Sequence, residues 1–584
     1  MKINDLATYL CLVALILVSC KKDEPIEPPV DNSYPAGTLD LGSDVNADFF
    51  GRVVDANGEA VSNASVIIGD LSTVTDNNGA FKLDAASVPS KLAYIKVTKS
   101  GYFTGAKSII PQTNALNFVQ ITLVEKQLTH QFASGTPTTV SVQNGVSIDF
   151  PDNYLDQFGT EYFGQVKVYA SYVAPDDVDI DKFLGASYGQ GKDAVERYFE
   201  NYGMLMVELE GNSGQAISLA PGDAATIHMR VDANQISNAP SGIPMVYFDE
   251  KVGYWVENGW ATLSGDEYAG TVTHFDSWSF AAAYSAAQVS GFVTNDLGDS
   301  LSNFVIETNS LNGAAHIYTA SNGKFNAYVP SDQVIDLSTF DECGTATIIT
   351  SVGPFSSGTN GIGDFQIPNG SVNLTKQVGQ LLDCGASAVN NGYVVMTVGN
   401  GSYIQHVADG NFEVHIINCN SASTYEAYGF DMSTNEQSIV YQKDMSGNIN
   451  QTGTIVACAA TSEYISFSID AVSPILYTAD LFCGQLDSGG GPYFTAYPID
   501  HSIEIISQVF TEGSYSYYAN QQPNTVWVHP DDMYNFASFS IQSVLIEWPA
   551  NPGGYLQMTF HGFYTDVLLN QHTISGDMVV LRDS

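Results

Sequence analysis

The sequence has few positive charges: 20 Lys and Arg stand against 63 Asp and Glu, a formal net charge of −43 over 584 residues. Nucleic acids and anionic membrane surfaces would repel such a chain, so we exclude both as direct binding partners. Charged residues of either sign make up only 14% of the chain, and Gly, Asn, Ser and Thr are abundant instead. This composition favours short strands joined by turns over helices. At roughly 100–150 residues per domain, we expect about four to five all-β domains, each a β-sandwich.

The motifs of common metal and hydrolytic sites are also missing. No two cysteines have the Cys-x-x-Cys spacing of a zinc site, and no His-Glu-x-x-His occurs. The single His-x-x-Glu, His501 to Glu504, opens an alternating segment that predicts a strand, on which residues three apart face opposite sides. Gly185 to Gly189 fits Gly-x-Ser-x-Gly around Ser187, but it follows an acidic loop rather than a buried parallel strand. We therefore predict a flexible insertion there, no enzyme and no required cofactor.

An acidic cluster precedes that motif. Carboxylates two residues apart could converge on Ca²⁺ if the loop curled, and the candidates are Asp176, Asp177, Asp179 and Asp181. Lys182 and Phe183 follow where an EF-hand has Gly and a distal Glu, so a solvated acidic loop is the alternative. Residues 193–201, DAVERYFEN, could form a short helix.

The N-terminal segment predicts membrane attachment. Lys2 precedes an apolar run from Leu10 to Val18, which has the length of a signal-peptide core and is too short to span a bilayer. The run ends in LVSC, which resembles a bacterial lipobox, so we predict a signal peptide at 1–19 and a lipid anchor on Cys20. An ordinary cleaved signal with an incidental cysteine is the alternative. The acidic, Pro-rich segment 20–47 predicts a flexible linker.

Basic residues followed by acids come directly after this cysteine, as KKDE. They resemble a signal that sends lipoproteins to the outer face of the outer membrane. We therefore expect a lipid-anchored outer-membrane protein at the cell surface, with the periplasmic face as the alternative.

One pattern of strands and turns occurs more than once. Gly51 to Leu83 has turn signals at 55–58 and 76–79 between strand-like stretches. This pattern resembles the carboxypeptidase regulatory-like domain, which implies a small, non-catalytic β-sandwich. Gly291 to Gly298 repeats the spacing of the first copy, and a weaker echo runs from Gly392 to Phe412. The three predicted sandwiches are residues 48–126, 286–380 and 381–470.

The segment between the first two copies, 127–285, has its own signature. A Phe150-Pro151 break follows an alternating strand. Later come Pro-x-x-Tyr-Phe-Asp-x-x-x-Gly-x-Trp, from Pro244 to Trp255, and His-Phe-x-x-Trp, from His274 to Trp278. These motifs resemble the extracellular domain shared by cartilage intermediate layer proteins, which implies an extracellular β domain without an established active site. We expect His274 to be a core or capping histidine rather than a metal ligand.

The remainder of the chain, 471–584, alternates polar and apolar residues and predicts a further β domain that resembles no family. It holds a group of aromatic residues beside a polar turn: Tyr515, Tyr517, Tyr518 and Trp527. Rings at the rim of a sandwich could stack on sugars or anchor a protein partner. Strand residues that face a core are the alternative.

Five cysteines follow the signal segment: Cys343, Cys384, Cys419, Cys458 and Cys483. In the oxidising compartment that we expect, they allow two disulfides and one remaining thiol. The connectivity stays open at this point, and zinc is the rival interpretation.

Together these patterns predict a non-enzymatic cell-envelope lipoprotein that binds or presents a glycan or protein partner at the outer membrane. A structural or adhesive surface stalk without a specific small ligand is the first alternative. A hydrolase of unrecognised type, with its site near Tyr188 to Arg197, is the second.

Overall fold

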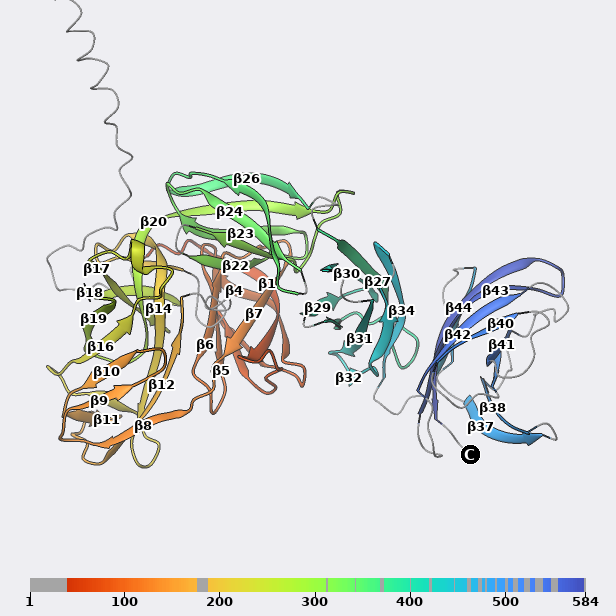
Figure 1. Ribbon diagram of the computed structural model, residues 1–584, viewed down its shortest axis with the longest axis horizontal. Coiled ribbons are helices and arrows are strands. Elements are labelled where there is room, and N and C mark those ends of the chain that lie inside the picture. Colours follow the sequence, from red (N-terminus) through yellow and green to blue (C-terminus); the bar gives the residue numbers. More distant parts are fainter. Residues whose placement is uncertain are drawn as a thin grey trace, which may run out of the picture. The chain divides into compact units, whose positions relative to one another are not determined.

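The structure, a computed structural model, is built from β-strands throughout the part of the chain that it describes (Figure 1). It describes residues 39–581 except 176–186, 311–312, 342, 368–371, 400, 420–422, 446, 459–463, 471–474, 478–480, 489–490, 499–502, 508–512, 519–525, 531–538 and 548–554. Within these ranges the single helical element is the 3₁₀ turn η1 (Ile236–Asn238), and no helix is long and apolar enough to cross a membrane. The all-β prediction is therefore confirmed.

The chain divides into two compact units, Met1–Phe340 with Ala346–Ser371 and Asp341–Thr345 with Val372–Ser584. The first domain of the first unit is a sandwich of two sheets, with strand orders β4-β1-β7 and β3-β2-β5-β6. Alternate residues face the space between the sheets, as Ala93, Ile95 and Val97 of β5 do. Its strands are β1 (Asp44–Asp55), β2 (Ser65–Ile68), β3 (Leu71–Val74), β4 (Ala80–Pro89), β5 (Ala93–Thr98), β6 (Gly105–Ile109) and β7 (Leu116–Leu123).

The second domain is built on one large sheet with the order β8-β12-β14-β20-β17-β18-β19-β16-β10-β9. Trp278 and Phe280 of β20 lie fully buried in its core. Its strands are β8 (Leu128–Ala133), β9 (Thr138–Ser141), β10 (Ser147–Phe150), β11 (Tyr154–Asp156), β12 (Gln165–Val173), β13 (Tyr188–Gln190), β14 (Glu196–Glu210), β15 (Ile217–Leu219), β16 (Ala225–Arg230), β17 (Gly242–Asp249), β18 (Tyr254–Ser264), β19 (Glu267–Val272) and β20 (Ser277–Thr294).

The short helix expected at residues 193–201 is not formed, so that prediction is wrong. Glu196 to Asn201 lie in β14, which pairs with β13 and β20 there. Arg197 pairs with Asp193, four residues before it, but the Glu200 carboxylate accepts a hydrogen bond from Ser310, which lies far along the chain. Long-range pairing has overridden the local pattern.

The third domain shares a strand with the second. The first part of β20 pairs with β14 and β17, whereas Ala286 to Thr294 pair with β23 and β26 (Figure 1). The boundary predicted between residues 285 and 286 therefore falls inside a continuous strand. The other strands of this domain are β21 (Val305–Asn309), β22 (Ala314–Tyr318), β23 (Lys324–Pro330), β24 (Ile335–Phe340), β25 (Ala346–Val352) and β26 (Gly358–Gln366).

The second unit holds two further sandwiches. The fourth domain has sheets β30-β27-β34 and β29-β28-β31-β32, with β33 beside β31, and the fifth has sheets β36-β35-β44-β43-β42-β40 and β37-β38-β39-β41. The strands of the fourth are β27 (Leu374–Asp383), β28 (Gly392–Val398), β29 (Gly401–Val407), β30 (Asn411–Ile417), β31 (Thr424–Asp431), β32 (Glu436–Gln437), β33 (Tyr441–Asp444) and β34 (Ile449–Ala457). Those of the fifth are β35 (Tyr464–Ile469), β36 (Ile475–Tyr477), β37 (Leu481–Ser488), β38 (Gly491–Pro498), β39 (Ile503–Ser507), β40 (Gly513–Tyr518), β41 (Val526–Pro530), β42 (Ser540–Glu547), β43 (Tyr555–Thr565) and β44 (Gln571–Leu581).

The third copy of the repeated pattern begins at Gly379 and not near Gly392. Gly379 lies in the first strand of its domain, and a Cβ there would come within 2.5 Å of the Phe412 ring. Gly51 is placed in the same way against Phe81. The predicted boundary between residues 380 and 381 therefore cuts through β27. The start of this copy could not be recognised in the sequence, because Ala386 occupies the position at which the earlier copies have a turn glycine.

Candidate functional site

Several predicted site residues lie outside the described ranges. These are the lipidation candidate Cys20 and the Ca²⁺ candidates Asp176, Asp177, Asp179 and Asp181. The described residues contain no group of three or more His, Cys, Asp or Glu arranged to hold a metal ion. Lipidation and Ca²⁺ binding at these positions therefore stay predictions.

The aromatic candidates of the fifth domain lie on two strands. Tyr515 is on β40 and packs, partly buried, against the core of the domain, as the alternative interpretation expects. The backbones of Tyr517, Tyr518 and Trp527 belong to β40 and β41, but their side chains lie outside what the structure describes. A binding role for these three rings stays a prediction.

Four of the five cysteines form two disulfides, Cys343–Cys419 and Cys384–Cys458. The fifth, Cys483, keeps its thiol and is buried in the core of the fifth domain. The predicted number of disulfides is confirmed, and the structure supplies the connectivity that the sequence left open.

Ser187, the hydrolytic candidate, and Glu504, the zinc candidate, both take part in hydrogen bonds within the β-sheet domains. Ser187 directly precedes β13, and its carbonyl oxygen accepts a hydrogen bond from the backbone of Phe199. Glu504 lies on β39, as the alternating pattern predicted, and accepts a hydrogen bond from the Thr495 hydroxyl. Its proposed partner, His501, lies outside the described residues.

The second domain has a cavity of about 480 Å³ where it meets the first domain, which we call the acidic pocket. The ends of β14 and β17 and the turn before β20 form most of its wall, and Phe103 and Thr104 of the first domain close it. Its other charged and ring-bearing residues are Glu208, Tyr247, Phe248, Asp249, Glu250, Lys251, His274, Phe275 and Asp276. Both motifs quoted above for this domain contribute residues, so positions far apart in the sequence meet here.

His274 and Asp276 form a close pair in the wall of the acidic pocket. Their side chains approach to 3.3 Å, from His274 Nε2 to Asp276 Oδ2. Burial, together with the nearby carboxylates Glu250, Asp249 and Glu208, raises the pKa of Asp276 to about 7. Burial also lowers the pKa of His274, so near neutral pH the imidazole is uncharged and the carboxyl is half protonated.

Rings on either side fix the orientation of His274. Its imidazole meets Tyr247 edge to face at 4.8 Å between centroids, and its carbonyl oxygen accepts a hydrogen bond from the Trp278 indole at 3.2 Å. The expectation of a core or capping histidine overlooked Asp276 and Glu208. The sequence signal that could have drawn attention to them is the acidic residue two positions after His274.

Three lysines compensate part of the negative charge of the pocket: Lys251 in its wall, and Lys126 and Lys96 beside it. Lys126 pairs with Glu208 and lies over the Phe103 ring, while Lys96 Nζ approaches Glu250 Oε2 to 2.7 Å. Burial nevertheless raises the pKa of Glu208. The pocket therefore favours a positively charged group, which would find carboxylates on several sides and aromatic faces between them.

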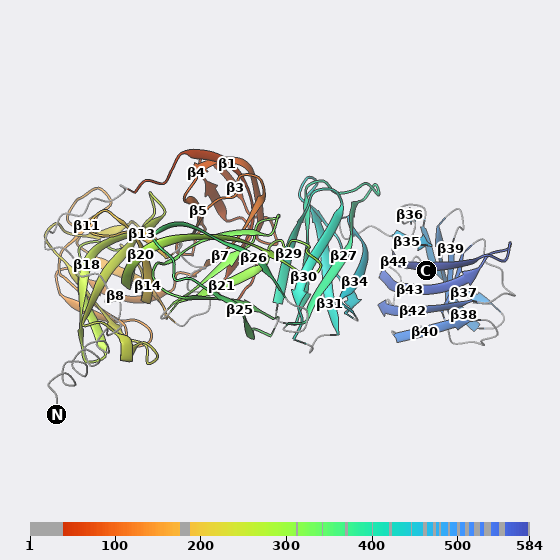
Figure 2. The same cartoon turned by 90° about the horizontal axis from the view of Figure 1, so that it is seen from above.

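Three of the sandwiches share an arrangement of their terminal strands, which Figure 2 shows for β27 and β34. In each, the first and last strands lie side by side and run parallel. We call β1–β7, β20–β26 and β27–β34 the terminal strand pairs. Each pair aligns eight residues of one strand with residues of the other.

No family model and no curated protein matches this sequence. Among solved structures, a Streptococcal ancillary pilin is similar at 10% identity and a TM-score of 0.13, over 41% of this chain and 100% of that one. The Bacillus anthracis TIE protein is similar at 8% identity and a TM-score of 0.14, over 75% and 68% of the two chains. BcpA, the major pilin subunit of Bacillus cereus, follows at 9% and 0.12, over 72% and 100%. At these scores the likeness assigns neither a family nor a function to the chain.

Proposed function

We propose that the chain is a non-enzymatic surface stalk that resists mechanical tension between its ends. The observation that carries this proposal is the presence of a terminal strand pair in three of its sandwiches. When a domain is pulled by its ends, parallel adjacent terminal strands are drawn past each other along their length. The hydrogen bonds of the ladder then resist together, whereas an antiparallel pair pulled from one end opens bond by bond.

The order of the strands supports the same role. The terminal strand pair β20–β26 is followed along the chain by β27–β34, so tension that leaves one pair enters the next. A lipid anchor on Cys20 would hold one end of such a stalk at the membrane. The two disulfides fit a location outside the cytoplasm, since disulfides persist in oxidising compartments.

Single-molecule stretching tests the proposal through proline substitutions in β7. This strand forms the edge of its sheet and pairs with β1 alone. Since successive N–H groups of a strand point to opposite sides, either Val119→Pro or Gln120→Pro removes a hydrogen bond to β1, and the other removes a group on the open edge. We expect one of the two to lower the rupture force of the first domain strongly. The other is its matched control.

Each proline variant is compared with alanine at the same position, so that the lost side chain does not decide the result. Equal rupture forces for both proline variants would contradict the proposal. The proposal would also be contradicted if the first domain ruptured at no higher force than a domain whose first and last strands are antiparallel.

A second candidate function is recognition of a basic group in the acidic pocket, and the volume of the pocket favours it. A cavity of about 480 Å³ is in the range of ligand sites, and such sites occur preferentially between domains. The carboxylates and rings would suit a lysine or arginine side chain of a protein partner.

The pKa of Asp276 gives this second candidate a pH signature. Between pH 6 and pH 8 its ionised fraction rises from about one tenth to about nine tenths, so the pocket gains negative charge. Binding of N-acetyl-lysine amide, followed by calorimetry, should therefore strengthen from pH 6 to pH 8. Asp276→Asn should remove that dependence, whereas Asp84→Asn, at an exposed site on β4, should keep it. A pH dependence that survives in Asp276→Asn would contradict the assignment.

A further inference from the structure

The two disulfides of the second unit overlap along the chain. In sequence order the cysteines are Cys343, Cys384, Cys419 and Cys458, and the bonds join the first to the third and the second to the fourth. Each bond therefore has one cysteine inside the loop that the other bond closes. Among the ways to pair four cysteines, this is the one in which neither loop contains or precedes the other.

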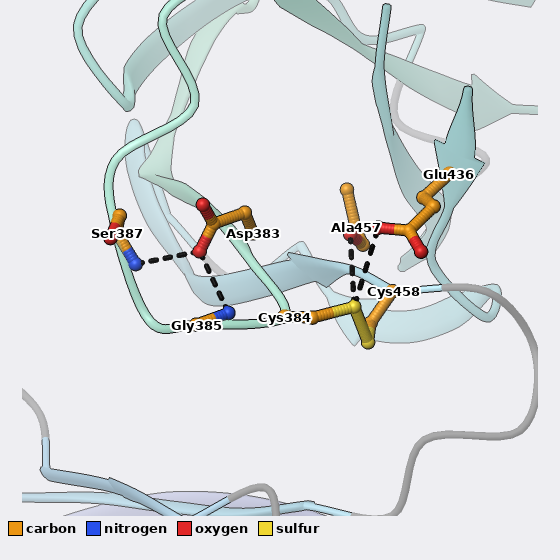
Figure 3. Close-up of a disulfide and its surroundings, with 7 residues drawn as sticks. All are labelled: Asp383, Cys384, Gly385, Ser387, Glu436, Ala457 and Cys458. Carbon is orange, nitrogen blue, oxygen red and sulfur yellow. Dashed lines mark hydrogen bonds between the residues drawn. A yellow bond between two sulfur atoms is a disulfide. The ribbon is translucent and has the colours of Figure 1, made fainter. Parts of the chain in front are cut away.

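The second of these bonds lies at a terminal strand pair. Cys384 directly follows β27 and Cys458 directly follows β34, where Asp383 is aligned with Ala457. Because the strands are parallel, both cysteines lie at the same end of the pair, with 4.9 Å between their Cα atoms. Figure 3 shows the bond beside Glu436, whose Oε2 lies 3.4 Å from Cys384 Sγ.

The loop after β27 is itself held in place. The Asp383 carboxylate accepts hydrogen bonds from the backbone N–H groups of Gly385 and Ser387, each at 2.8 Å (Figure 3). Cys384 is thus fixed between its strand and a constrained turn. The first bond starts from the loop Asp341–Thr345, between β24 and β25, and ends at Cys419, shortly after β30.

The overlap creates two covalent routes from Cys343 to Cys458. One crosses the Cys343–Cys419 bond and then follows the 39 residues from Cys419 to Cys458. The other follows the 41 residues from Cys343 to Cys384 and then crosses the second bond. The backbone alone takes 115 residues between the same two points. At about 3.3–3.6 Å per extended residue, each route reaches about 130–150 Å, and the backbone alone about 380–410 Å.

We propose that the overlapping disulfides are a redundant extension limiter, which rests on the proposed function because it operates only when the chain is under tension. Once the strands between Cys343 and Cys458 have detached, either bond alone stops the chain at nearly the same length. The redundancy follows from the near equality of the two routes, which differ by two residues. Sequential or nested pairing of the same cysteines would not have this property, since loss of one bond would then lengthen the chain substantially.

Stretching the full chain between its ends tests the limiter through the contour length after complete unfolding. The variants are Cys343→Ser with Cys419→Ser, Cys384→Ser with Cys458→Ser, and all four substitutions together. We expect each two-residue variant to stay within about 10 Å of the wild type, and the four-residue variant to gain about 250–270 Å. A gain above about 100 Å in either two-residue variant would overturn the proposal, as would no gain in the four-residue variant.

The wild type provides a second measurement that does not depend on the folding of the variants. Dithiothreitol added to the stretched chain should produce two cleavages, of which the first lengthens it by less than about 10 Å and the second by about 250–270 Å. Two comparable lengthening steps would show that the bonds do not act as alternatives. Rupture forces test the stalk and contour lengths test the limiter, so failure of one is distinguishable from failure of the other.

Discussion

At the scale of single residues, one five-residue turn recurs in each of the five domains. In each copy the first side chain accepts hydrogen bonds from the backbone N–H groups two and four positions later. The fourth residue has a positive φ, which is inexpensive for glycine and strained for most other residues. The first residues of the copies are Asp55, Asp76, Asp156, Asn295, Asp341, Asp383 and Asp566.

Two copies lack glycine at this fourth position: one has Ala386, and the other is the copy between β43 and β44. Its fourth residue is Leu569, with a φ of 68°, and its side chain is 69% exposed. A leucine there has the backbone strain without the packing that could offset it. We expect Leu569→Gly to stabilise the fifth domain by about 0.5–1 kcal/mol, the released strain less the larger chain entropy of unfolded glycine.

Chemical denaturation of the full chain measures this effect, and Leu568→Gly is the matched control. Leu568 is also exposed, at 78%, but it has no positive φ. Glycine should therefore only destabilise at position 568, by about 0.5–1 kcal/mol. Equal effects of the two substitutions would show that Leu569 is not strained.

At the scale of elements, local signals were sufficient for turns and failed for shared strands. The turns predicted at 55–58 and 76–79 are formed, because Asp and Gly at fixed spacing decide the backbone by themselves. The helix expected in part of β14 is a strand, since its partner strand β20 and the Ser310 partner of Glu200 lie far along the chain. For the same reason the sequence could not show that β20 continues from one sheet into the next.

The acidic pocket shows the same limit. Its residues were visible as two motifs, but their meeting with Glu208 of β14 in one pocket depends on strands that pair far along the chain. The number of disulfides followed from counting cysteines, whereas their overlap needed the structure, because parallel strands bring Cys384 to Cys458. The sequence therefore did not show which residues long-range strand pairing brings together.

At the scale of the whole molecule, the domains of the first unit are joined by buried contacts. Phe103 and Ala106 of the first domain are buried against Phe248 and Trp255 of the second. The Ser108 hydroxyl also donates a hydrogen bond to the Gly253 carbonyl oxygen at 2.6 Å. The first domain therefore covers an apolar face of the large sheet, and β20 joins that sheet to the third domain.

This shared core predicts that the three domains of the first unit unfold together. Phe103 is 4% exposed, so Phe103→Ala should cost about 3 kcal/mol. The loss should appear in the whole first unit, lowering hydrogen-exchange protection in β10 of the second domain and β24 of the third as well as in β5. Protection in β30 of the fourth domain, which belongs to the second unit, should not change. If only the first domain lost protection, the domains would be independent modules, and the buried contact at Phe103 would join them without coupling their stabilities.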